Sequence, residues 1–378
     1  MINSVTLKKF RGFSDVTVPL SNVTLLTGTN GVGKTSVLEG LYCLFSDARL
    51  DVHSLVRYNR TVGISVDHLI NGIPNLVSRQ TYNYRLFWDE CPMFNEQTCC
   101  VSANGKDGSV MQWTFTKAKM SDIDAQTSRD AGLMGITIDS STDIALFRWD
   151  FFNNKTDQKQ EIASEIKSMV QVLKPDGGLY LIPPENRGSC VCKYLDFVSL
   201  KARPQELSYQ TAKKLTESLK FLNPRITDIR ISKIEHGLSV ILDGDSEITL
   251  GTIGNGAVTL SSTLIEIFEV VERFKKADQQ SDVPVYILID EIGAGIHYSV
   301  MDDVWKCIRD FTVEYPNIQF VMTSHSYDCV RSFCNVFVGN TDASIVRLHR
   351  AVGNEIVPTQ YDHSRFGGIV SDEMEVRG

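Results

Sequence analysis

The chain has 378 residues with 42% hydrophobic content and a formal net charge of −8, from 38 Lys and Arg against 46 Asp and Glu. This length and apolar content can bury a large core, in one large domain with insertions or in two lobes. The acidic balance excludes a protein that coats nucleic acid over its whole surface, so any such contact must be local. The sequence shows no signal-peptide pattern and no run of about 20 apolar residues, so we expect a cytoplasmic protein without a membrane partner.

The first 46 residues are predicted to form two strands, a phosphate-binding loop and a helix. The loop, residues 28–35, reads Gly-Thr-Asn-Gly-Val-Gly-Lys-Thr and lies between a strand-like run and a helix-like run. This order forms a P-loop, whose backbone N–H groups and helix N-terminus hold phosphate oxygens. Lys34 is predicted to reach the outer phosphates of ATP, and the Thr35 hydroxyl to bind Mg2+. The other predicted nucleotide contacts here are Asn30, Gly31, Gly33 and Ser36.

The middle of the chain shows patterns that predict helices and strands, but we assign no chemical role to residues there. Residues 50–150 are predicted to be β-rich, with turns at pairs such as Asn104-Gly105. Apolar residues at helical spacing predict a helix over 158–174. The elements expected next are a buried strand over 179–182, a helix over 205–223, and strands near 226–233 and 238–243.

From about residue 247 the pattern alternates between helix and strand. Amphipathic helices are predicted over 260–275 and 300–311. Continuous apolar runs, which are typical of strands buried in a parallel sheet, cover 285–289 and 319–323. A closing hairpin is predicted around Gly353-Asn354.

Two carboxylates, Asp290 and Glu291, directly follow the apolar run 285–289. In α/β sheets, ligands bind at the carboxyl ends of the strands. Asp290 is therefore predicted to hold Mg2+, directly or through water, and Glu291 to polarise the attacking water. An acidic turn that only ends a strand would look the same by itself, but the P-loop in the same chain favours the catalytic interpretation.

His325 follows the other apolar run, 319–323, and is predicted to lie at the same sheet edge, where it can hydrogen-bond a γ-phosphate. The alternative is a loop histidine with a structural role. Its position after Asp290, Glu291 and a helix favours the functional interpretation. Lys34, Glu291 and His325 are thus the predicted catalytic residues of an ATPase, which converts ATP and water to ADP and phosphate.

These elements predict an α/β fold. We expect a P-loop NTPase with a doubly wound, mainly parallel sheet, a β-rich subdomain and a helical lobe. The chain is predicted to be a single domain, 1–378. Its predicted parts are the N-terminal strands and P-loop (1–48), a β-rich insertion (49–150), a lobe of helix and strand (151–246) and a final part with the remaining site residues (247–378).

Taken together, the segments resemble the ABC-type ATPase head of the clade of SMC, RecF, RecN and OLD (overcoming lysogenization defect) proteins. Among these, the chain is most similar to OLD-like ATPase subunits without a Toprim domain. Residues 28–35 match Walker A, 287–291 match Walker B, and His325 matches the switch histidine. Gly295-Ile296-His297 stands where OLD-like members have a D-loop that ends in Gly-Leu-His. The opening residues 7–13 resemble the start of the clade, which implies that Arg11 contacts the nucleotide.

The resemblance also implies a signature motif before Walker B. Within the predicted loop 250–256, Gly254, Asn255 and Gly256 resemble the Gly-Asp-Gly form of OLD-like ATPases, although Asn255 replaces the acidic residue. A plain loop that caps the following helix is the alternative. The Q-loop of the family has no clear match, with Gln80 as a guess.

By resemblance, two chains sandwich two ATP molecules with Mg2+. Each ATP then meets Lys34 and Thr35 of one chain and Gly254 and Gly256 of the other. ATP would close the heads, and hydrolysis directed by Glu291 would release them. The implied partner is a second copy of the chain, in a homodimer or a higher oligomer.

Three biological roles stay open at this point. The preferred one is the sensor or scaffold subunit of a prokaryotic antiphage defence system. Only 53 residues follow His325, too few for a Toprim nuclease, so we expect either a nuclease-like effector that acts in trans or a sequence that is part of a longer chain. The second is a RecF-like DNA repair ATPase, because residues 187–233 carry ten basic and four acidic residues, a pattern that a solvated helix face shares. The third is a module that uses nucleotide only for assembly, which Glu291 and His325 disfavour.

Overall fold

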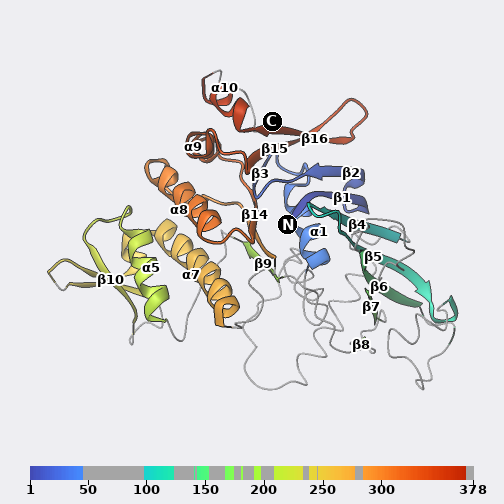
Figure 1. Ribbon diagram of the computed structural model, residues 1–378, viewed down its shortest axis with the longest axis horizontal. Coiled ribbons are helices and arrows are strands. Elements are labelled where there is room, and N and C mark those ends of the chain that lie inside the picture. Colours follow the sequence, from blue (N-terminus) through green and yellow to red (C-terminus); the bar gives the residue numbers. More distant parts are fainter. Residues whose placement is uncertain are drawn as a thin grey trace. The chain divides into compact units, whose positions relative to one another are not determined.

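The computed structural model describes residues 1–45, 98–122, 140, 143–152, 167–173, 180–181, 191–196, 208–232, 238–244, 246–276 and 284–371. The chain divides into two compact units, and Figure 1 labels the helices and strands of both. Unit 1 takes residues 1–20, 35–191 and 350–358, and unit 2 takes residues 21–34, 192–349 and 359–378. Each unit therefore combines segments that are far apart in the sequence.

Unit 1 is built on a seven-stranded sheet of order β2-β1-β4-β5-β6-β7-β8, in which every pairing is antiparallel. The strands are β1 (Ile2–Phe10), β2 (Phe13–Pro19), β4 (Thr98–Gly105), β5 (Val110–Lys119), β6 (Asp143–Phe152), β7 (Lys167–Leu173) and β8 (Tyr180–Leu181). The predicted β-rich character of 50–150 is confirmed for β4, β5 and β6. The turn predicted at Asn104-Gly105 is displaced, because both residues belong to the end of β4 and the chain turns at 106–109, where the Gly105 N–H donates to the Ser109 carbonyl at 2.7 Å.

Helix α1 (Lys34–Phe45) packs closely on this sheet through its unit 1 residues. A Cβ at Gly40 would lie 2.6 Å from the Leu7 side chain of β1, so a larger residue at this helix position would have to displace that side chain. Phe10 and Trp113 meet edge to face nearby in the sheet, with ring centroids 6.1 Å apart. The helix that continues the P-loop is thus anchored by apolar packing.

Two predictions for these segments are wrong. The helix predicted over 158–174 is a strand, β7, at residues 167–173, and the rest of that range lies outside the described residues. Val170 and Val172 are β-branched, which favours a strand, and they pair with Arg148 and Leu146 of β6. The first 46 residues also hold three strands and not two, because β2 pairs with β1 in a hairpin.

Unit 2 contains a six-stranded sheet of order β16-β15-β3-β14-β13-β9. Its central pairs, β15 with β3, β3 with β14 and β14 with β13, are parallel. The strands are β3 (Val23–Thr27), β9 (Val191–Asp196), β13 (Val285–Asp290), β14 (Ile318–Thr323), β15 (Ala343–Arg350) and β16 (Ile356–Asp362). Every residue of β3, β13 and β14 is buried, which confirms the two predicted apolar strands 285–289 and 319–323.

The predicted hairpin is confirmed between β15 and β16. Gly353 and Asn354 have φ of 99° and 69°, the left-handed values that such a tight turn requires. The Ala351 N–H donates to the Glu355 carbonyl at 2.8 Å and closes the turn.

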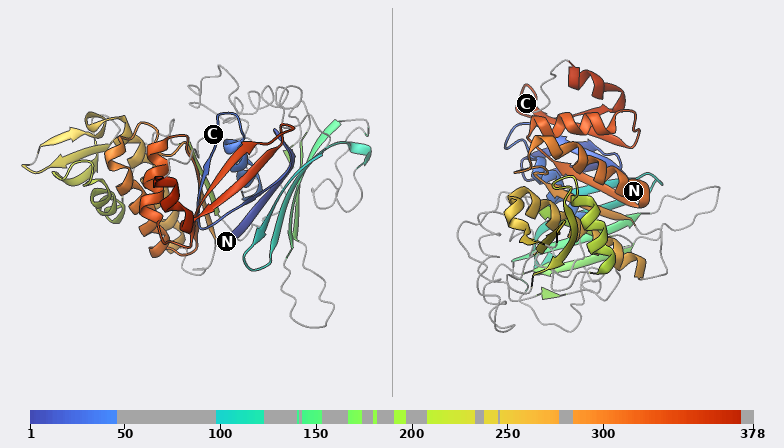
Figure 2. Two further views of the ribbon diagram at one scale, coloured as in Figure 1. Left: turned by 90° about the horizontal axis from the view of Figure 1, so that it is seen from above. Right: turned by 90° about the vertical axis from the view of Figure 1, so that its left-hand side faces the viewer.

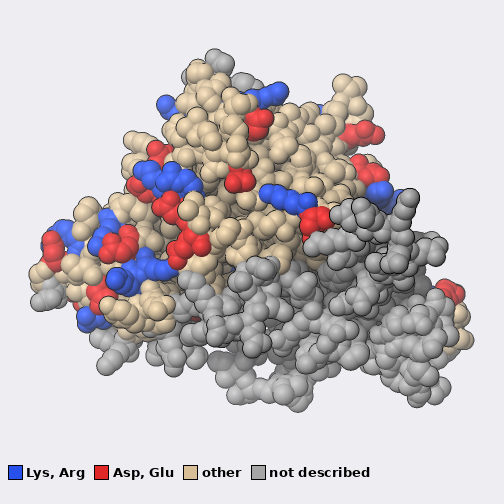
Figure 3. Space-filling model, viewed as in Figure 1, with Lys and Arg blue, Asp and Glu red and all other residues tan. Residues whose placement is uncertain are grey.

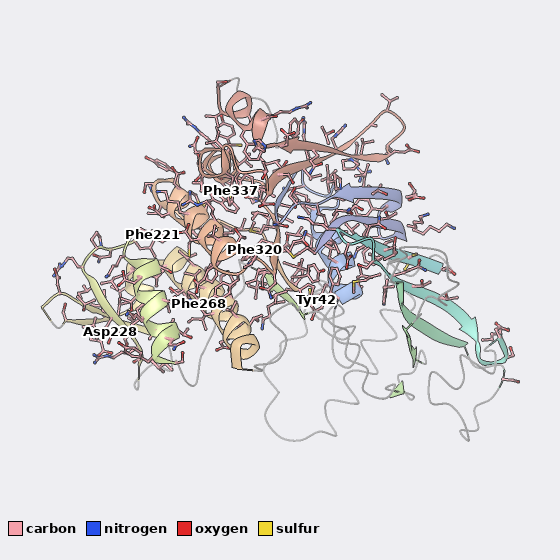
Figure 4. The ribbon with its side chains drawn as sticks, viewed as in Figure 1. Tyr42, Phe221, Asp228, Phe268, Phe320 and Phe337 are labelled. Atoms are coloured by element: carbon pink, nitrogen blue, oxygen red, sulfur yellow. The ribbon has the colours of Figure 1, made fainter. Side chains whose placement is uncertain are left out.

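Five helices and two short turns accompany the described part of this sheet in unit 2. They are α6 (Leu250–Ile253), α7 (Asn255–Lys276), α8 (Met301–Glu314), α9 (Tyr327–Phe337), α10 (Phe366–Ser371), and 3-10 turns at Tyr298–Val300 and His363–Arg365. α8 packs against α9, and α9 against α10 (Figure 1). Figure 4 places Phe337 on α9, Phe320 on β14 and Phe268 on α7. Within the described ranges, no helix is long and apolar enough to cross a bilayer.

Unit 2 also carries a small lobe made of α5 (Tyr209–Leu219), β10 (Ile226–Ile231), β11 (Leu238–Leu242) and β12 (Glu247–Thr249). The three strands form an antiparallel sheet, and α5 packs against β10 and against α7 (Figure 2). Ser208 caps α5, since its hydroxyl accepts the Thr211 N–H at 3.0 Å. The helix predicted over 205–223 and the two strands after it are confirmed.

Candidate functional site

Three neighbouring parallel strands of unit 2 end at the predicted site residues. β3 runs into the P-loop, β13 ends at Asp290, and β14 ends at Thr323, two residues before His325. β14 lies between β3 and β13 in the sheet. The carboxyl ends of these strands therefore meet at one edge, where α/β proteins bind ligands.

The P-loop backbone depends on its glycines. Gly28, Gly31 and Gly33 have φ of 134°, 76° and 104°, values that side chains other than glycine adopt at a cost. A Cβ at Gly28 would also lie 2.3 Å from the Leu348 carbonyl oxygen of β15. Gly31 and Asn30 are exposed, so the tip of the loop is open to a ligand.

The Lys34 side chain is 5% exposed and lies along the loop. Its Nζ donates to the Gly28 carbonyl at 2.9 Å and to the Thr29 carbonyl at 3.2 Å. Burial lowers the pKa of Lys34, and the negative charges of Glu291 and Asp290 partly oppose this shift. The ammonium group is thus held close to where the P-loop would receive phosphate oxygens, with both carboxylates near enough to influence its charge.

Asp290 is 9% exposed, and hydroxyl groups bind both of its carboxylate oxygens. Thr323 Oγ1 donates to Oδ1 at 2.6 Å, and the Tyr194 hydroxyl donates to Oδ2 at 3.2 Å. Thr323 comes from β14 and Tyr194 from β9, the two strands that flank β13. The predicted metal ligand is therefore fixed from both sides.

Glu291 and His325, predicted separately, are in contact. His325 Nδ1 lies 2.5 Å from Glu291 Oε2, so an ionised glutamate accepts the Nδ1 proton of the ring. Glu291 has φ of 58°, and its N–H donates to Thr323 Oγ1 at 2.8 Å. The His325 side chain is 60% exposed and that of Glu291 27%, so this pair faces solvent beside the buried Asp290.

The segment predicted as the signature loop is mostly helical, which corrects the expectation of a loop over 250–256. Residues 250–253 form α6, Gly254 is its C-cap with φ of 136°, and α7 begins at Asn255, five residues before the predicted start at 260. The side chain of Asn255 lies outside the described part of the structure. A Cβ at Gly256 would lie 2.5 Å from the Gly295 carbonyl oxygen, so the predicted signature and D-loop segments are packed together.

The predicted D-loop, Gly295 to His297, is exposed at its tip. Gly293 and Gly295 have φ of 85° and 76°, which turn the chain after Glu291. The His297 ring accepts the Ser299 N–H at 3.3 Å and stacks on the 66% exposed Tyr298, with ring centroids 4.3 Å apart. These groups offer a partner an exposed aromatic surface.

The remaining predicted residues have separate positions. Thr35 and Ser36 follow Lys34 in the first turn of α1 and are half-buried. Arg11 belongs to unit 1, has φ of 52°, and its Nε lies 2.6 Å from Glu39 Oε2 in a largely buried ion pair. Its contact with nucleotide stays a prediction. Gln80 lies outside the described residues.

The donors at this edge fit Mg2+ together with a nucleotide. Mg2+ prefers oxygen ligands and is usually held by one or two carboxylates, phosphate oxygens and water, not by a protein cage. Asp290 supplies a carboxylate of the required kind, and Thr35 a hydroxyl that directly follows Lys34. No group of three His, Cys, Asp or Glu that could bind a metal occurs among the residues that the structure describes.

Sequence reasoning missed Tyr194 and Thr323. The strand β9 that carries Tyr194 was not predicted. Thr323 was seen only as the last residue of an apolar run. The position of a hydroxyl at the end of that run, next to the strand of Asp290, was the signal that could have identified it.

A buried parallel sheet with a glycine loop, a buried lysine and two carboxylates at the strand ends fits the class of P-loop NTPases. The family model of the AAA ATPase domain matches residues 1–64. The chain is also similar to the retron Vc95 probable ATPase of Vibrio cholerae serotype O1 biovar El Tor, at 20% identity over 381 residues that cover 86% of this chain and 70% of that protein. Both comparisons support an ATPase of the AAA/ABC type.

Proposed function

We propose that the chain hydrolyses ATP with Mg2+ at the edge formed by Lys34, Asp290, Glu291 and His325. The observation that carries this proposal is the hydrogen bond between His325 and Glu291 beside the fixed carboxylate of Asp290. Lys34 and the P-loop backbone bind the phosphates, Thr35 and Asp290 hold Mg2+, and Glu291 accepts the proton of the attacking water. His325 orients Glu291 and reaches the γ-phosphate. Bound Mg2+ supplies charge neutralisation on the phosphates.

The test is the ATP turnover of Glu291→Gln. A general base contributes about 10²- to 10⁴-fold to a rate, so kcat should fall by about that factor while ATP still binds. Glu355→Gln, which changes an exposed glutamate in the β15–β16 turn, is the matched control and should retain wild-type turnover. Turnover of Glu291→Gln at the wild-type rate would show that the base is assigned wrongly.

We also propose that ATP drives self-association, in the manner of the OLD-like heads that the sequence resembles. Gly254 and Gly256 of one copy would contact the ATP held by Lys34 of another. The packing of Gly256 against Gly295 supports this idea, because it joins the predicted signature and D-loop segments into one exposed surface.

The biological role that we favour is a sensor or scaffold subunit of a prokaryotic antiphage system, with a nuclease-like effector in trans. The relative named as a probable ATPase of a retron favours an ATPase that works inside a larger bacterial system. Purification from the native host under gentle conditions tests this role. Recovery of a nuclease-like protein whose association changes with ATP is the expected result, and recovery of the chain alone with and without ATP would contradict it.

A RecF-like role in DNA binding is the second candidate, since the α5 lobe is rich in Lys and Arg. Figure 3 shows these residues interspersed with Asp and Glu. Four of the basic side chains are paired with carboxylates, namely Lys214 with Glu314, Lys220 with Glu217, Arg225 with Asp243 and Arg230 with Asp228. This pairing favours a solvated surface. Affinity for duplex DNA that falls steeply with salt would support the DNA role, and absence of binding at low salt would remove it.

A further inference from the structure

The carboxylate of Asp290 is oriented by two hydroxyls from opposite sides of its strand. Thr323 of β14 binds Oδ1 at 2.6 Å, and Tyr194 of β9 binds Oδ2 at 3.2 Å. Asp290 is 9% exposed, so little water is present to replace either donor. These two hydroxyls therefore help to fix the rotation of the carboxylate.

We propose that Tyr194 is a positioning residue of the metal site, and that its hydroxyl tunes the affinity of the nucleotide site for Mg2+. This inference rests on the proposed function, in which Asp290 holds Mg2+. A hydrogen bond from Tyr194 fixes the plane of the Asp290 carboxylate and so the direction in which its lone pairs face the cation. Groups that hydrogen-bond metal ligands typically contribute 10- to 100-fold to metal affinity.

Substitutions of Thr323 and Tyr194 differ in how specifically they test the orientation of the Asp290 carboxylate. Thr323 makes the shorter bond, but its hydroxyl also accepts the Glu291 N–H, so removing it would disturb the base as well as the metal ligand. Tyr194 is half-buried and comes from the strand on the other side of β13. Its phenol can be removed by Tyr194→Phe while the ring is kept. Because its bond is the longer of the two, we expect an effect near the lower end, about 10-fold.

The experiment is a titration of Mg2+ in a binding assay with a fluorescent ATP analogue, with a parallel series in EDTA. For Tyr194→Phe, half-maximal stimulation of binding should need about 10-fold more Mg2+ than for the wild type. Affinity in EDTA should be unchanged, because the P-loop and Lys34 are untouched. A variant with only a packing defect would bind the ATP analogue more weakly both with Mg2+ and in EDTA.

Tyr286→Phe is the matched control. Tyr286 lies on β13, the strand of Asp290, and is buried, so this variant also removes a tyrosine hydroxyl from the sheet but leaves both Asp290 bonds in place. Its Mg2+ requirement should equal that of the wild type. Tyr194→Gln, which keeps a hydrogen-bond donor, should recover part of the Mg2+ affinity lost in Tyr194→Phe and serves as a second variant if the first unfolds.

The outcomes separate this inference from the proposed function. A wild-type chain that binds no ATP analogue, or binds it without any effect of Mg2+, would contradict the proposed function itself. Mg2+-dependent binding that is identical in the wild type and in Tyr194→Phe would overturn only the role of Tyr194.

Discussion

Gly256 lies where the first turn of α7 meets the chain at Gly295, and a side chain has no space there. A Cβ would approach the Gly295 carbonyl oxygen to 2.5 Å and the Ile296 Cα to 3.3 Å. Both are backbone atoms, which cannot move away by changing a rotamer. The need for glycine at this position therefore has a cause within one chain, in addition to any contact with ATP.

We predict that Gly256→Ala destabilises the protein. Alanine adds about 1 kcal/mol of helix propensity, but overpacking against backbone costs about 1–3 kcal/mol, so the clash should exceed the gain. Gly251→Ala is the matched control in α6, because its Cβ would meet no atom within 4 Å, and it should be neutral or slightly stabilising. Denaturant unfolding of both variants measures the difference. A Gly256→Ala protein as stable as the wild type would contradict the packing argument.

Lys34 predicts a pH dependence for nucleotide binding. Burial lowers its pKa below the ordinary value of 10.5, so the side chain loses its proton at a lower pH than an exposed lysine does. Phosphates bind the charged form, hence the affinity for ATP should begin to fall below pH 10.5 as the pH rises. Titration of ATP affinity with pH measures this fall. A constant affinity up to the ordinary lysine pKa would contradict it.

At the scale of single residues, the positions of site residues at strand ends could be predicted from the sequence, while their chemical roles stay predictions. Asp290, Glu291 and His325 could be predicted because apolar runs identified their strands and the P-loop identified the ligand edge. Tyr194 could not be predicted in this way. Its role arises from the pairing of β9 next to β13, and that contact joins residues 96 positions apart.

Among the elements, α8 and α9 are joined by an aromatic cluster around Trp305. Its ring meets Phe333 edge to face at 4.9 Å and Phe337 at 6.2 Å, and its Nε1 donates to the Cys329 carbonyl at 3.0 Å. Trp305 is fully buried. Since α9 begins two residues after His325, this packing supports the segment that carries His325.

We predict that Trp305→Ala lowers the free energy of unfolding by about 3–5 kcal/mol, the usual cost of removing a buried aromatic side chain. Val313→Ala, on the same helix but 76% exposed, should change it by less than about 0.5 kcal/mol. Thermal or denaturant unfolding distinguishes the two variants. Equal effects would show that α8 and α9 are not held together by this cluster.

Strands could be predicted from the sequence where a whole run of residues is apolar and therefore buried. β13 and β14 are apolar throughout, so their pattern fits a strand buried on both faces. For residues 167–173 the apolar positions 169, 170, 172 and 173 fit helix and strand alike. The partner strand β6, distant in sequence, decided the outcome, and local periodicity carries no information about such a partner.

For the whole molecule, the proposed ATP sandwich predicts a change of oligomeric state. Glu291→Gln should bind ATP without hydrolysing it and so accumulate the associated form in the presence of Mg2+. Sedimentation velocity should show a larger species with ATP and the starting species without it. Lys34→Ala, which removes the ammonium group that we propose binds the phosphates, is the control and should not respond to ATP. A Glu291→Gln protein that stays monomeric at high concentration with ATP and Mg2+ would contradict the sandwich.

One oxygen atom, Thr323 Oγ1, serves two functional groups. It donates to the carboxylate of Asp290 and accepts the backbone N–H of Glu291. A shift of the Asp290 carboxylate can therefore reach the Glu291 backbone through this hydroxyl, in addition to the peptide bond that joins the two residues. In the proposed function, where Asp290 holds the cation and Glu291 activates the water, the two tasks are then energetically coupled, and substitutions at Asp290 and Glu291 should show a non-zero interaction energy in a double-mutant cycle. The arrival of the cation would itself act as a signal that sets the position of the base.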